Sequence, residues 1–391
     1  ICNKTSLVPI YRRLVLFTKE YLILKIIMNE NFKILLKILG VFLALYLFLV
    51  GINGLSSGIK LLGGDFAKQV MSTTGNPFVA LFIGILATTL FQSSSTTSSL
   101  IVAMVGSGTV TLSGAVPMIM GANIGTTVTN TIVSIGHIQR GNEFKRAFQA
   151  ATIHDFFNLL AVLVLFPIEY FFGVLEKSAS WLGVLLFGSI STDEVFKSPI
   201  KAAIKWGSKQ IQQFSFDNDI FFIILSVLLT FLMLYAIVKL LRSLVLEKVE
   251  VFFDTYIFKT AMRAMIFGML LTISVQSSSI TTSTIVPLAG AGVLSLRQIY
   301  PFTLGANIGT TVTALLASLT LNVTAMVAAF AHLFFNIFGI IAVYLNPFLR
   351  DVPIKLSEKF SDLAIKNKFI PVTYLVVVFF IIPFLIIFLG R

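Results

Sequence analysis

The chain has 391 residues, of which 57% are hydrophobic and only 12% charged, and its mean hydropathy is +0.95. About a quarter of the residues in a soluble globular domain are charged, so this composition excludes such a domain and indicates an all-α integral membrane protein. The formal net charge of +12 does not indicate a nucleic-acid partner, because the basic residues lie between long uncharged runs and not on an otherwise polar surface.

Residues 1–33 are expected to form a basic extension outside the core fold. Lys and Arg interrupt the apolar residues of this segment, and the chain does not begin with Met. The extension is interpreted either as a basic interfacial helix or as a consequence of where translation is taken to start. A cleavable signal peptide is disfavoured by the same charges.

Seven apolar runs further along the chain are long enough to cross about 30 Å of hydrocarbon as helices. They lie near residues 34–55, 115–136, 147–172, 220–241, 299–321, 324–346 and 370–390. Two other runs, 78–106 and 262–292, are apolar, then rich in hydroxyl groups, then apolar again. This pattern predicts re-entrant helical hairpins that enter the membrane, break and return to the same side.

The sequence repeats itself. The motif Gln-Ser-Ser-Ser at residues 92–95 recurs at 276–279, and the stretch Gly-Ala-Asn-Ile-Gly-Thr-Thr-Val-Thr at 121–129 recurs at 305–313, so both recur at one common offset. The motif His-x-Phe-Phe-Asn at 154–158 recurs at 332–336, an offset smaller by six, so one loop of the second copy is shorter. A constant register over such a distance indicates a tandem duplication.

The fold class expected is two inverted-topology repeats, each with a re-entrant hairpin and a broken helix, plus one extra C-terminal transmembrane helix. If the hairpins do not cross, each copy crosses three times, and an odd number turns the second copy upside down. The basic segments then face the cytoplasm. The domains predicted are the extension (1–33), the first transmembrane repeat (34–188), an extracytoplasmic connecting segment (189–219), the second transmembrane repeat (220–346), and a cytoplasmic loop with the C-terminal helix (347–391).

Hydroxyl groups are concentrated at the two predicted breaks. They occur on nine of the twelve residues from Thr88 to Ser99 and on eight of the eleven from Ser274 to Thr284. One such cluster alone usually reflects helix packing, because Ser and Thr donate to a carbonyl one turn earlier. Two equivalent clusters indicate a binding site, since matching breaks of an inverted repeat converge at the midplane. Neutral oxygen ligands of this kind suit a hard cation such as Na⁺.

The Gly-Ala-Asn-Ile-Gly-Thr-Thr stretches, which contain Asn123 and Asn307, are interpreted as the other half of that site. Asn can donate and accept, and a helix beginning at the Thr pair would direct free N–H groups at an anion. No Lys or Arg lies in either cluster, so a bound oxyanion would need cations that arrive with it. The expected Na⁺ ligands are Ser94, Thr96, Ser278, Thr281 and Asp155.

Asp155 has two open interpretations, a cation ligand at membrane depth and a helix-entry residue near the cytoplasmic surface. The second copy has Leu333 at this position. His154 and His332 are expected to form polar contacts between helices, and Asn158 and Asn336 to share that role because they lie one helical turn further on.

These paired motifs resemble the type II sodium/phosphate cotransporter family, the phosphate:Na⁺ symporters, including its bacterial members. The resemblance is strongest from Gly121 to Glu169 and from Val275 to Leu319, and covers approximately residues 36–344. The connecting segment of this chain is short where animal members have a long extracellular loop. The short form suits a multi-pass protein of the bacterial inner membrane.

The resemblance implies sodium-coupled secondary active uptake of inorganic phosphate by alternating access. It implies that the two Gln-Ser-Ser-Ser segments form one shared phosphate and Na⁺ site. It also implies that Asp155 matches an Asp that accompanies electrogenic transport in animal members. The residues that would contact phosphate or Na⁺ are Gln92, Ser93, Ser94, Ser95, Gln276, Ser277, Ser278 and Ser279, with Thr96 and Asn123 nearby. Asn123 and Asn307 are also expected among the substrate-binding residues.

Two alternatives stay open, a sodium-coupled carrier of another oxyanion and an uncoupled anion channel. An enzyme is not expected, because no motif pairs a base with a nucleophile. The partners expected are phosphate, Na⁺ and the lipid bilayer, with no organic cofactor and no nucleic acid.

Overall fold

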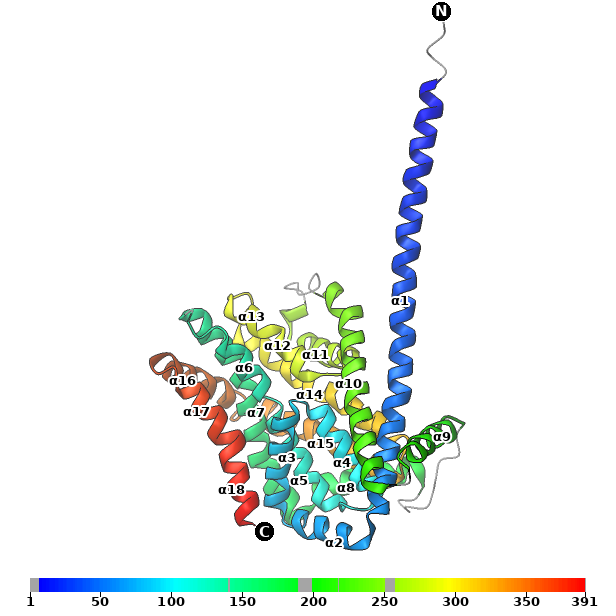
Figure 1. Ribbon diagram of the computed structural model, residues 1–391. Coiled ribbons are helices and arrows are strands. Elements are labelled where there is room, and N and C mark those ends of the chain that lie inside the picture. Colours follow the sequence, from blue (N-terminus) through cyan, green and yellow to red (C-terminus); the bar gives the residue numbers. More distant parts are fainter. Residues whose placement is uncertain (1–6, 140, 189–198, 217, 250–256, 391) are drawn as a thin grey trace, which may run out of the picture.

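The computed structural model describes the chain over residues 7–139, 141–188, 199–216, 218–249 and 257–390, without side chains for 7–31, 200, 201, 242 and 245–249. Every regular element in these ranges is helical. Figure 1 shows the helices gathered into one bundle, with the N-terminal half of the first helix projecting beyond it. The all-helical fold expected from composition is confirmed over the described residues.

In the described residues, the first copy of the repeat and its flanks contain nine helices before the second copy begins. They are α1 (Leu7–Leu61), α2 (Gly63–Thr74), α3 (Pro77–Phe91), α4 (Ser94–Ser107), α5 (Leu112–Gly125), α6 (Val128–Ile135), α7 (Asn142–Phe172), α8 (Val174–Phe187) and α9 (Pro199–Phe214).

The second copy and the C-terminal region follow the same order. The helices are α10 (Asp219–Val249), α11 (Ala261–Val275), α12 (Ser278–Ser283), α13 (Ile285–Gly290), α14 (Leu296–Ser318), α15 (Val323–Gly339), α16 (Val352–Lys366), α17 (Ile370–Val376) and α18 (Ile382–Leu389). A 3₁₀ turn covers Ile257–Lys259, and π-helical turns extend α15 over Ile340–Tyr344 and join α17 to α18 over Val377–Ile381.

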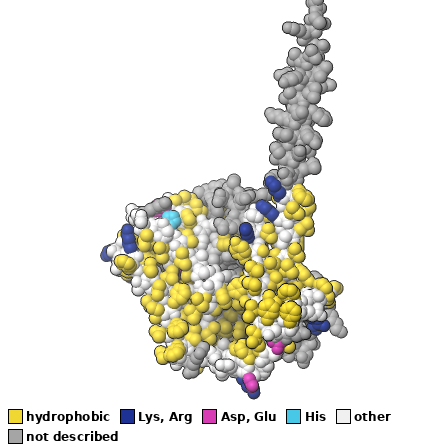
Figure 2. All heavy atoms as spheres, in the orientation of Figure 1, with side chains coloured by type: hydrophobic (Ala, Val, Ile, Leu, Met, Phe, Trp, Pro, Cys, Tyr) yellow, Lys and Arg dark blue, Asp and Glu magenta, His cyan; other side chains and the backbone are white. Residues whose placement is uncertain are grey.

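Five helical segments within the described ranges are long and apolar enough to cross a membrane. They are Phe32–Leu61, Asn142–Phe172, Asp219–Leu241, Val323–Tyr344 and Ile370–Leu389, and α2 with α3, bent by 99°, raises the number to six if that pair is one span. Hydrophobic side chains cover the flank seen in Figure 2, whereas the Lys and Arg side chains visible there lie toward the ends of the bundle. The chain is therefore a multi-pass membrane protein.

The predicted extension at 1–33 does not end at a helix boundary. Residues 7–33 belong to α1, which continues without a break to Leu61. The segment predicted to connect the copies contains α9, whose buried Ile204 and Gly207 face α1. Gly207 approaches Tyr46 and Val50 so closely that a side chain would not fit. Residues 189–198 and 217 of this segment lie outside the described ranges.

The two hydroxyl-rich runs each contain the predicted break. In the first run α3 ends at Phe91 and α4 begins at Ser94, and in the second α11 ends at Val275 and α12 begins at Ser278. Asn76 starts α3, where its side chain accepts hydrogen bonds from the backbone N–H groups of Phe78 (3.0 Å) and Val79 (3.5 Å). Thr260 caps α11 in the same way by accepting from Arg263 N–H (3.3 Å).

The prediction of a broken helix in each copy is correct for the first copy and wrong for the second. In the first copy α5 ends at Gly125 and α6 begins at Val128, whereas α14 runs from Leu296 to Ser318 without interruption. Residues after the first Thr pair are Val-Thr-Asn-Thr-Ile-Val, which are weak helix formers. Those after the second are Val-Thr-Ala-Leu-Leu-Ala, in which Ala and Leu favour a continuous helix.

Backbone-to-backbone packing joins each hairpin to the helix that follows it. Gly84 and Gly121 let α3 and α5 approach so closely that a Cβ at Gly121 would collide with the carbonyl of Leu81. Gly268 and Gly305 do the same for α11 and α14, where the collision would be with Met265. The two glycine pairs are related by the same offset as the repeated motifs, so the duplication seen in sequence is also present in the packing.

The two copies pack against each other in a reciprocal way. Helix α1 lies along α10, its equivalent in the other copy. Helix α5 packs against α15, and helix α7 packs against α14. These last two contacts are equivalent to each other. Helix α14 corresponds to α5 and helix α15 corresponds to α7, so each contact joins the same two elements with the copies interchanged. The core between the copies includes the buried rings of Phe157, Tyr300 and Phe335.

Candidate functional site

Gln92 and Gln276 end the first helix of each hairpin in the left-handed backbone region. Their φ and ψ angles are 53° and 25° for Gln92 and 56° and 27° for Gln276. This conformation costs a non-glycine residue about 1–2 kcal/mol, and such residues persist where the surrounding structure holds them. The break in each hairpin is therefore built in the same unusual way in both copies.

The side chains of the two Gln residues make matching hydrogen bonds. The Nε2 groups donate to the carbonyl oxygens of Thr89 (2.5 Å) and Ile273 (2.7 Å). The Oε1 atoms accept from the hydroxyl groups of Thr129 (3.0 Å) and Thr313 (2.8 Å). Gln92 is exposed, whereas Gln276 is buried, so the two copies place the same contact in different surroundings.

Ser93 and Ser277 begin the second helix of each hairpin. The Ser93 Oγ accepts from the N–H group of Thr96 (3.2 Å), and the Ser277 Oγ accepts from that of Ile280 (3.3 Å). Capping by Ser leaves other N–H groups of the first turn without a partner inside the helix. The N-terminus of α4 is therefore lined by N–H groups and by the hydroxyls of Ser94 and Ser95.

The two Gln-Ser-Ser-Ser motifs meet. The Ser95 hydroxyl donates to the backbone carbonyl of Gln276 (3.4 Å), and the Thr313 hydroxyl bonds both the Ser95 hydroxyl (3.4 Å) and Gln276 Oε1 (2.8 Å). Figure 1 shows that α4, α11, α12 and α14 lie together near the middle of the bundle. Motifs that are far apart in the sequence thus form one polar cluster.

This cluster has many buried hydroxyl groups and no buried base. The buried members are Ser94, Ser95, Thr96, Thr97, Ser278, Ser279, Thr281 and Thr282. Thr88 and Thr272, which are equivalent in the two copies, each have a buried Oγ1 without a hydrogen-bond partner in the part of the chain that the structure describes. Among the residues whose side chains the structure describes, no Lys or Arg is buried, and Asp155 is the one buried carboxylate.

A second contact joins the copies beside the first. The Asn130 Oδ1 accepts from the hydroxyls of Thr282 (3.0 Å) and Ser283 (3.0 Å), which ties α6 to α12. Position 314, which is equivalent to Asn130, is Ala in the second copy. The repeat pattern could not have identified Asn130 for this reason.

Asn123 and Asn307 lie in a buried network between α7 and the helices of the Gly-Ala-Asn motifs. Asn307 Oδ1 is 2.6 Å from His154 Nε2, and Asn307 Nδ2 donates to Asn158 Oδ1 (2.9 Å). Asn158 Nδ2 donates to the carbonyl of Asn123 (2.9 Å). The expected interhelical contacts of His154 and Asn158 are confirmed, and both polar ends of the Asn307 side chain are engaged by protein.

The second-copy members of that network are less completely paired. Asn336 Nδ2 donates to the carbonyls of Asn307 (3.3 Å) and His332 (3.2 Å). Both ring nitrogens of His332 are buried without a hydrogen-bond partner among the described residues. The interhelical role expected of His332 is therefore not fulfilled by its ring in this structure.

Asp155 is fully buried in the middle of α7, so it does not stand at the start of that helix. Its Oδ2 accepts from the hydroxyls of Thr131 (3.4 Å) and Tyr374 (3.3 Å), and its Oδ1 has no hydrogen-bond partner among the described residues. Thr131 is on α6, next to Asn130. The carboxylate is thus adjacent to the helix that contacts the second hairpin.

Sequence reasoning missed Thr129, Thr313 and Tyr374. The two Thr residues are equivalent members of the repeated stretch, so their recurrence at the common offset was an available signal. Tyr374 lies on α17, beyond the repeat, and no pattern in the sequence connects it with Asp155. Helix α18 also packs on α3, where Gly390 contacts Val79, so the C-terminal helix is attached to the first copy.

Comparison with known proteins gives one family. Residues 47–189 and 224–344 match the model of the family described as Na⁺/Pi-cotransporter. The chain is similar to the sodium-dependent phosphate transport protein 2B of Pongo abelii, with 33% identity covering 87% of this chain and 63% of that protein. It is also similar to the sodium-dependent phosphate transport protein 2A of Ovis aries, with 35% identity covering 87% of this chain and 65% of that protein.

The chain thus spans less than two thirds of the length of these relatives. No solved structure matches it. The two matched segments correspond to the two copies of the repeat, and the family is one of cotransporters, which agrees with the expectation that the chain is not an enzyme.

Proposed function

This chain belongs to the Na⁺/Pi-cotransporter family, and we propose on that basis that it takes up inorganic phosphate across the cell membrane together with Na⁺. The observation that carries the proposal is the contact between the two duplicated motifs, in which Ser95 bonds the carbonyl of Gln276. A small solute bound at this contact would touch both copies of the repeat at once.

The chemistry of the cluster favours an anion accompanied by cations. Hydroxyl, amide and helix N-terminal N–H groups donate to phosphate oxygens, but they do not balance the charge of a divalent anion in a water-poor interior. No buried Lys or Arg supplies that charge among the described side chains. Co-bound Na⁺ would supply it, and a site that needs both ions couples their transport.

We assign phosphate contacts to the two Gln-Ser-Ser-Ser motifs. The residues are Gln92, Ser93, Ser94, Ser95, Gln276, Ser277, Ser278 and Ser279. Asn307 joins the buried network with His154 and Asn158 through its side chain, and Asn123 joins it through its backbone carbonyl. We assign both residues a role in positioning the helices of the site and not a direct contact with phosphate.

We assign Na⁺ to hydroxyl and carboxylate oxygens beside the phosphate contacts, at Ser94, Thr96, Ser278, Thr281 and Asp155. Support for Asp155 comes from its burial and its unpaired Oδ1, because a buried carboxylate without a counter-charge is costly and is relieved by a bound cation. Tyr374 and Thr131 orient this carboxylate through its other oxygen.

Transport would proceed by alternating access between two inverted halves, at residues 34–188 and 220–346, with both hairpins re-entrant. The reciprocal packing of α5 with α15 and α7 with α14 supports this arrangement. The segment 189–219 would then be extracytoplasmic, and the region 347–391 would begin in the cytoplasm. The short connector suits a protein of the bacterial inner membrane.

The function is tested with purified full-length protein in proteoliposomes. With an inward Na⁺ gradient, labelled phosphate should accumulate above its equilibrium level, and replacing Na⁺ with K⁺ should abolish accumulation. Accumulation that is equal in K⁺ would defeat the proposal. Preferred uptake of sulfate or a dicarboxylate would identify a carrier of another oxyanion, and non-saturating anion flux without Na⁺ would identify a channel.

The same assay tests Asp155. Sodium titration of uptake by Asp155→Asn should require about tenfold more Na⁺ for half-maximal rate, because the amide cannot neutralise the cation. An unchanged sodium dependence would remove Asp155 from the site without affecting the assignment of phosphate.

A further inference from the structure

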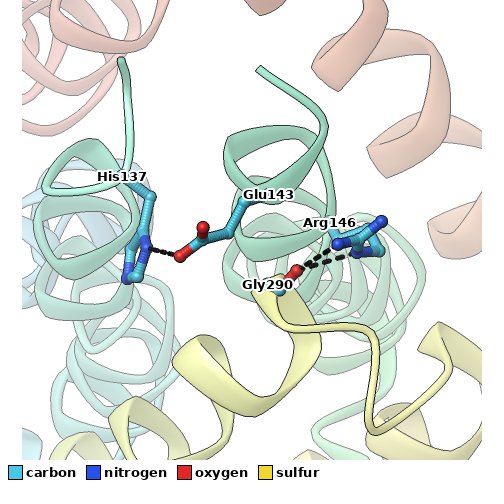
Figure 3. A network of polar contacts seen from close by, with 4 residues as sticks. All are labelled: His137, Glu143, Arg146 and Gly290. Carbon is cyan, nitrogen blue, oxygen red and sulfur yellow. Dashed lines mark hydrogen bonds and ion pairs between the residues drawn. The ribbon is translucent and has the colours of Figure 1, made fainter. Parts of the chain in front are cut away.

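Two hydrogen-bonded contacts outside the phosphate cluster join the copies at equivalent glycines, although their donors, Arg146 and Asn322, are not equivalent residues. Gly290 ends the second hairpin, and its carbonyl oxygen accepts from Arg146 Nε (2.8 Å) and Nη2 (2.6 Å) on α7 (Figure 3). Gly106, in the last turn of the first hairpin, accepts from Asn322 Nδ2 (3.1 Å) at the start of α15. Gly106 and Gly290 are related by the offset of the Gln-Ser-Ser-Ser motifs, so each hairpin end is held by the long helix of the other copy.

The packing around the two glycines is also equivalent. A Cβ at Gly290 would lie 3.2 Å from the Glu143 side chain and 3.5 Å from Ala147. A Cβ at Gly106 would lie 2.9 Å from the Leu321 side chain and 3.4 Å from Ala325. Leu321 and Ala325 are the equivalents of Glu143 and Ala147 in the register of the repeated His and Asn motif.

Small buried side chains lie on the interior side of each glycine contact. Beneath Gly290, Ala147, Ala151 and Val286 form a buried apolar cluster. Their equivalents beneath Gly106 are Ala325, Ala329 and Val102, all of which are buried. Side chains this small can separate and close again without leaving large groups exposed.

The two contacts differ in the chemistry of the donor. Arg146 is charged and donates twice, and hydrogen bonds from charged groups are shorter and stronger than neutral ones. Asn322 is neutral and donates once. At the Gly290 contact a further pair, His137 Nδ1 and Glu143 Oε1 at 2.8 Å, holds Glu143 beside the glycine (Figure 3). At the Gly106 contact the equivalent side chain, that of Leu321, is apolar.

We propose that the Arg146–Gly290 and Asn322–Gly106 contacts are the two gates of the transport path, with Arg146 and Asn322 as positioning residues that hold each hairpin end closed. The proposal rests on the alternating-access function proposed above. In the inverted arrangement, the Arg146 gate faces the cytoplasm and the Asn322 gate faces the opposite side. Because the cytoplasmic gate has the stronger donor, it is the harder of the two to open.

The test reads gate opening directly and needs no transported solute. In a Cys2→Ser background, which removes the one cysteine of the chain, the reporters Ala151→Cys and Ala329→Cys are placed under the two gates. Labelling by a small charged thiol reagent is timed in detergent, without Na⁺ or phosphate. Both positions are buried while the gates are closed, so the labelling rate measures the fraction of time each gate is open.

Arg146→Ala should raise labelling at Ala151→Cys about tenfold or more and leave Ala329→Cys unchanged or slower. Asn322→Ala should raise the labelling rate at Ala329→Cys about threefold and leave the labelling rate at Ala151→Cys unchanged. Arg146→Lys keeps a charged donor and should restore most of the protection. Equal increases at both reporters, or no increase at either, would overturn the proposal.

If Arg146→Ala does not give a monodisperse protein, Gly290→Ala should weaken the same gate from the other side, because its methyl group would lie 3.2 Å from the Glu143 side chain, which would have to shift. The results of this labelling test can be distinguished from the results of the uptake assay that tests the proposed function. Selective labelling without sodium-driven phosphate uptake would support the gates and reject phosphate as the solute. Sodium-driven uptake without selective labelling would overturn the gates and leave the function intact.

Discussion

Gln92 and Gln276 hold a backbone conformation that glycine adopts more easily, which implies that their side chains are needed where they are. Each amide bonds backward to its own helix and forward to a Thr of a later helix. The recurrence of Gln in the sequence predicted a polar break, but the left-handed backbone and the Thr partners are seen only in the folded structure. Strain kept at a duplicated polar site is typical of a functional position.

Replacing Gln276 separates strain from function. Gln276→Gly and Gln276→Ala both remove the amide and should lower sodium-driven phosphate uptake about tenfold or more. Gln276→Gly should nevertheless be about 1 kcal/mol more stable than Gln276→Ala, because only glycine adopts φ of 56° without strain. Sodium-driven phosphate uptake by the two purified variants measures the loss of function, and their thermal unfolding measures the difference in stability.

Gln213→Ala is the matched control, because Gln213 is exposed on α9. This variant should match the wild type in uptake and in thermal stability within error. Wild-type uptake by Gln276→Gly would show that the amide is dispensable and that the site assignment at this residue is wrong.

At the scale of elements, the glycine-mediated contacts of α3 with α5 and of α11 with α14 set the position of each hairpin. The sequence predicted the hairpins and their breaks because the hydroxyl clusters interrupt apolar runs. It did not predict that α14 is continuous, because the same Gly-Thr-Thr motif precedes weak helix formers in one copy and strong ones in the other.

Gly305→Ala should destabilise the protein by about 3 kcal/mol or prevent folding, because the new methyl group would meet the Met265 backbone carbonyl, which cannot move aside. Thermal unfolding in detergent measures the loss. Gly64→Ala, on α2, has nothing within 4 Å of the added methyl group and should be neutral or slightly stabilising. Similar stabilities of the two variants would contradict the close packing of α11 on α14.

At the scale of the whole molecule, the duplication is visible in sequence, packing and hydrogen bonds with the same offsets. The polar contacts between copies were predictable only in part. Ser95 and Gln276 belong to the repeated motif, so their convergence could be expected from the inverted arrangement. Asn130 and Tyr374 have no counterpart in the other copy, and their contacts depend on tertiary packing alone.

Inverted topology places equivalent loops on opposite sides of the membrane. Gly141 lies between α6 and α7, and Leu319, its equivalent in the register of the His and Asn motif, lies between α14 and α15; both are exposed. In a Cys2→Ser background, Gly141→Cys and Leu319→Cys should react with an impermeant thiol reagent from opposite faces of sealed, oriented vesicles. Reaction of both from the same face would refute the inverted arrangement.

The division of α5 and α6 into two rods, opposite a single rod in α14, makes the two halves mechanically unlike. The interruption at Thr126 and Thr127 separates α6, which is tied to α12 through Asn130, from α5, which packs closely on α3. The second half has no such interruption within α14 and must tilt as one piece. If the two halves reorient during transport, the first can bend at this interruption whereas the second moves as one rod, so the two reorientations would differ in activation enthalpy while the ion gradients alone would set the direction of net transport.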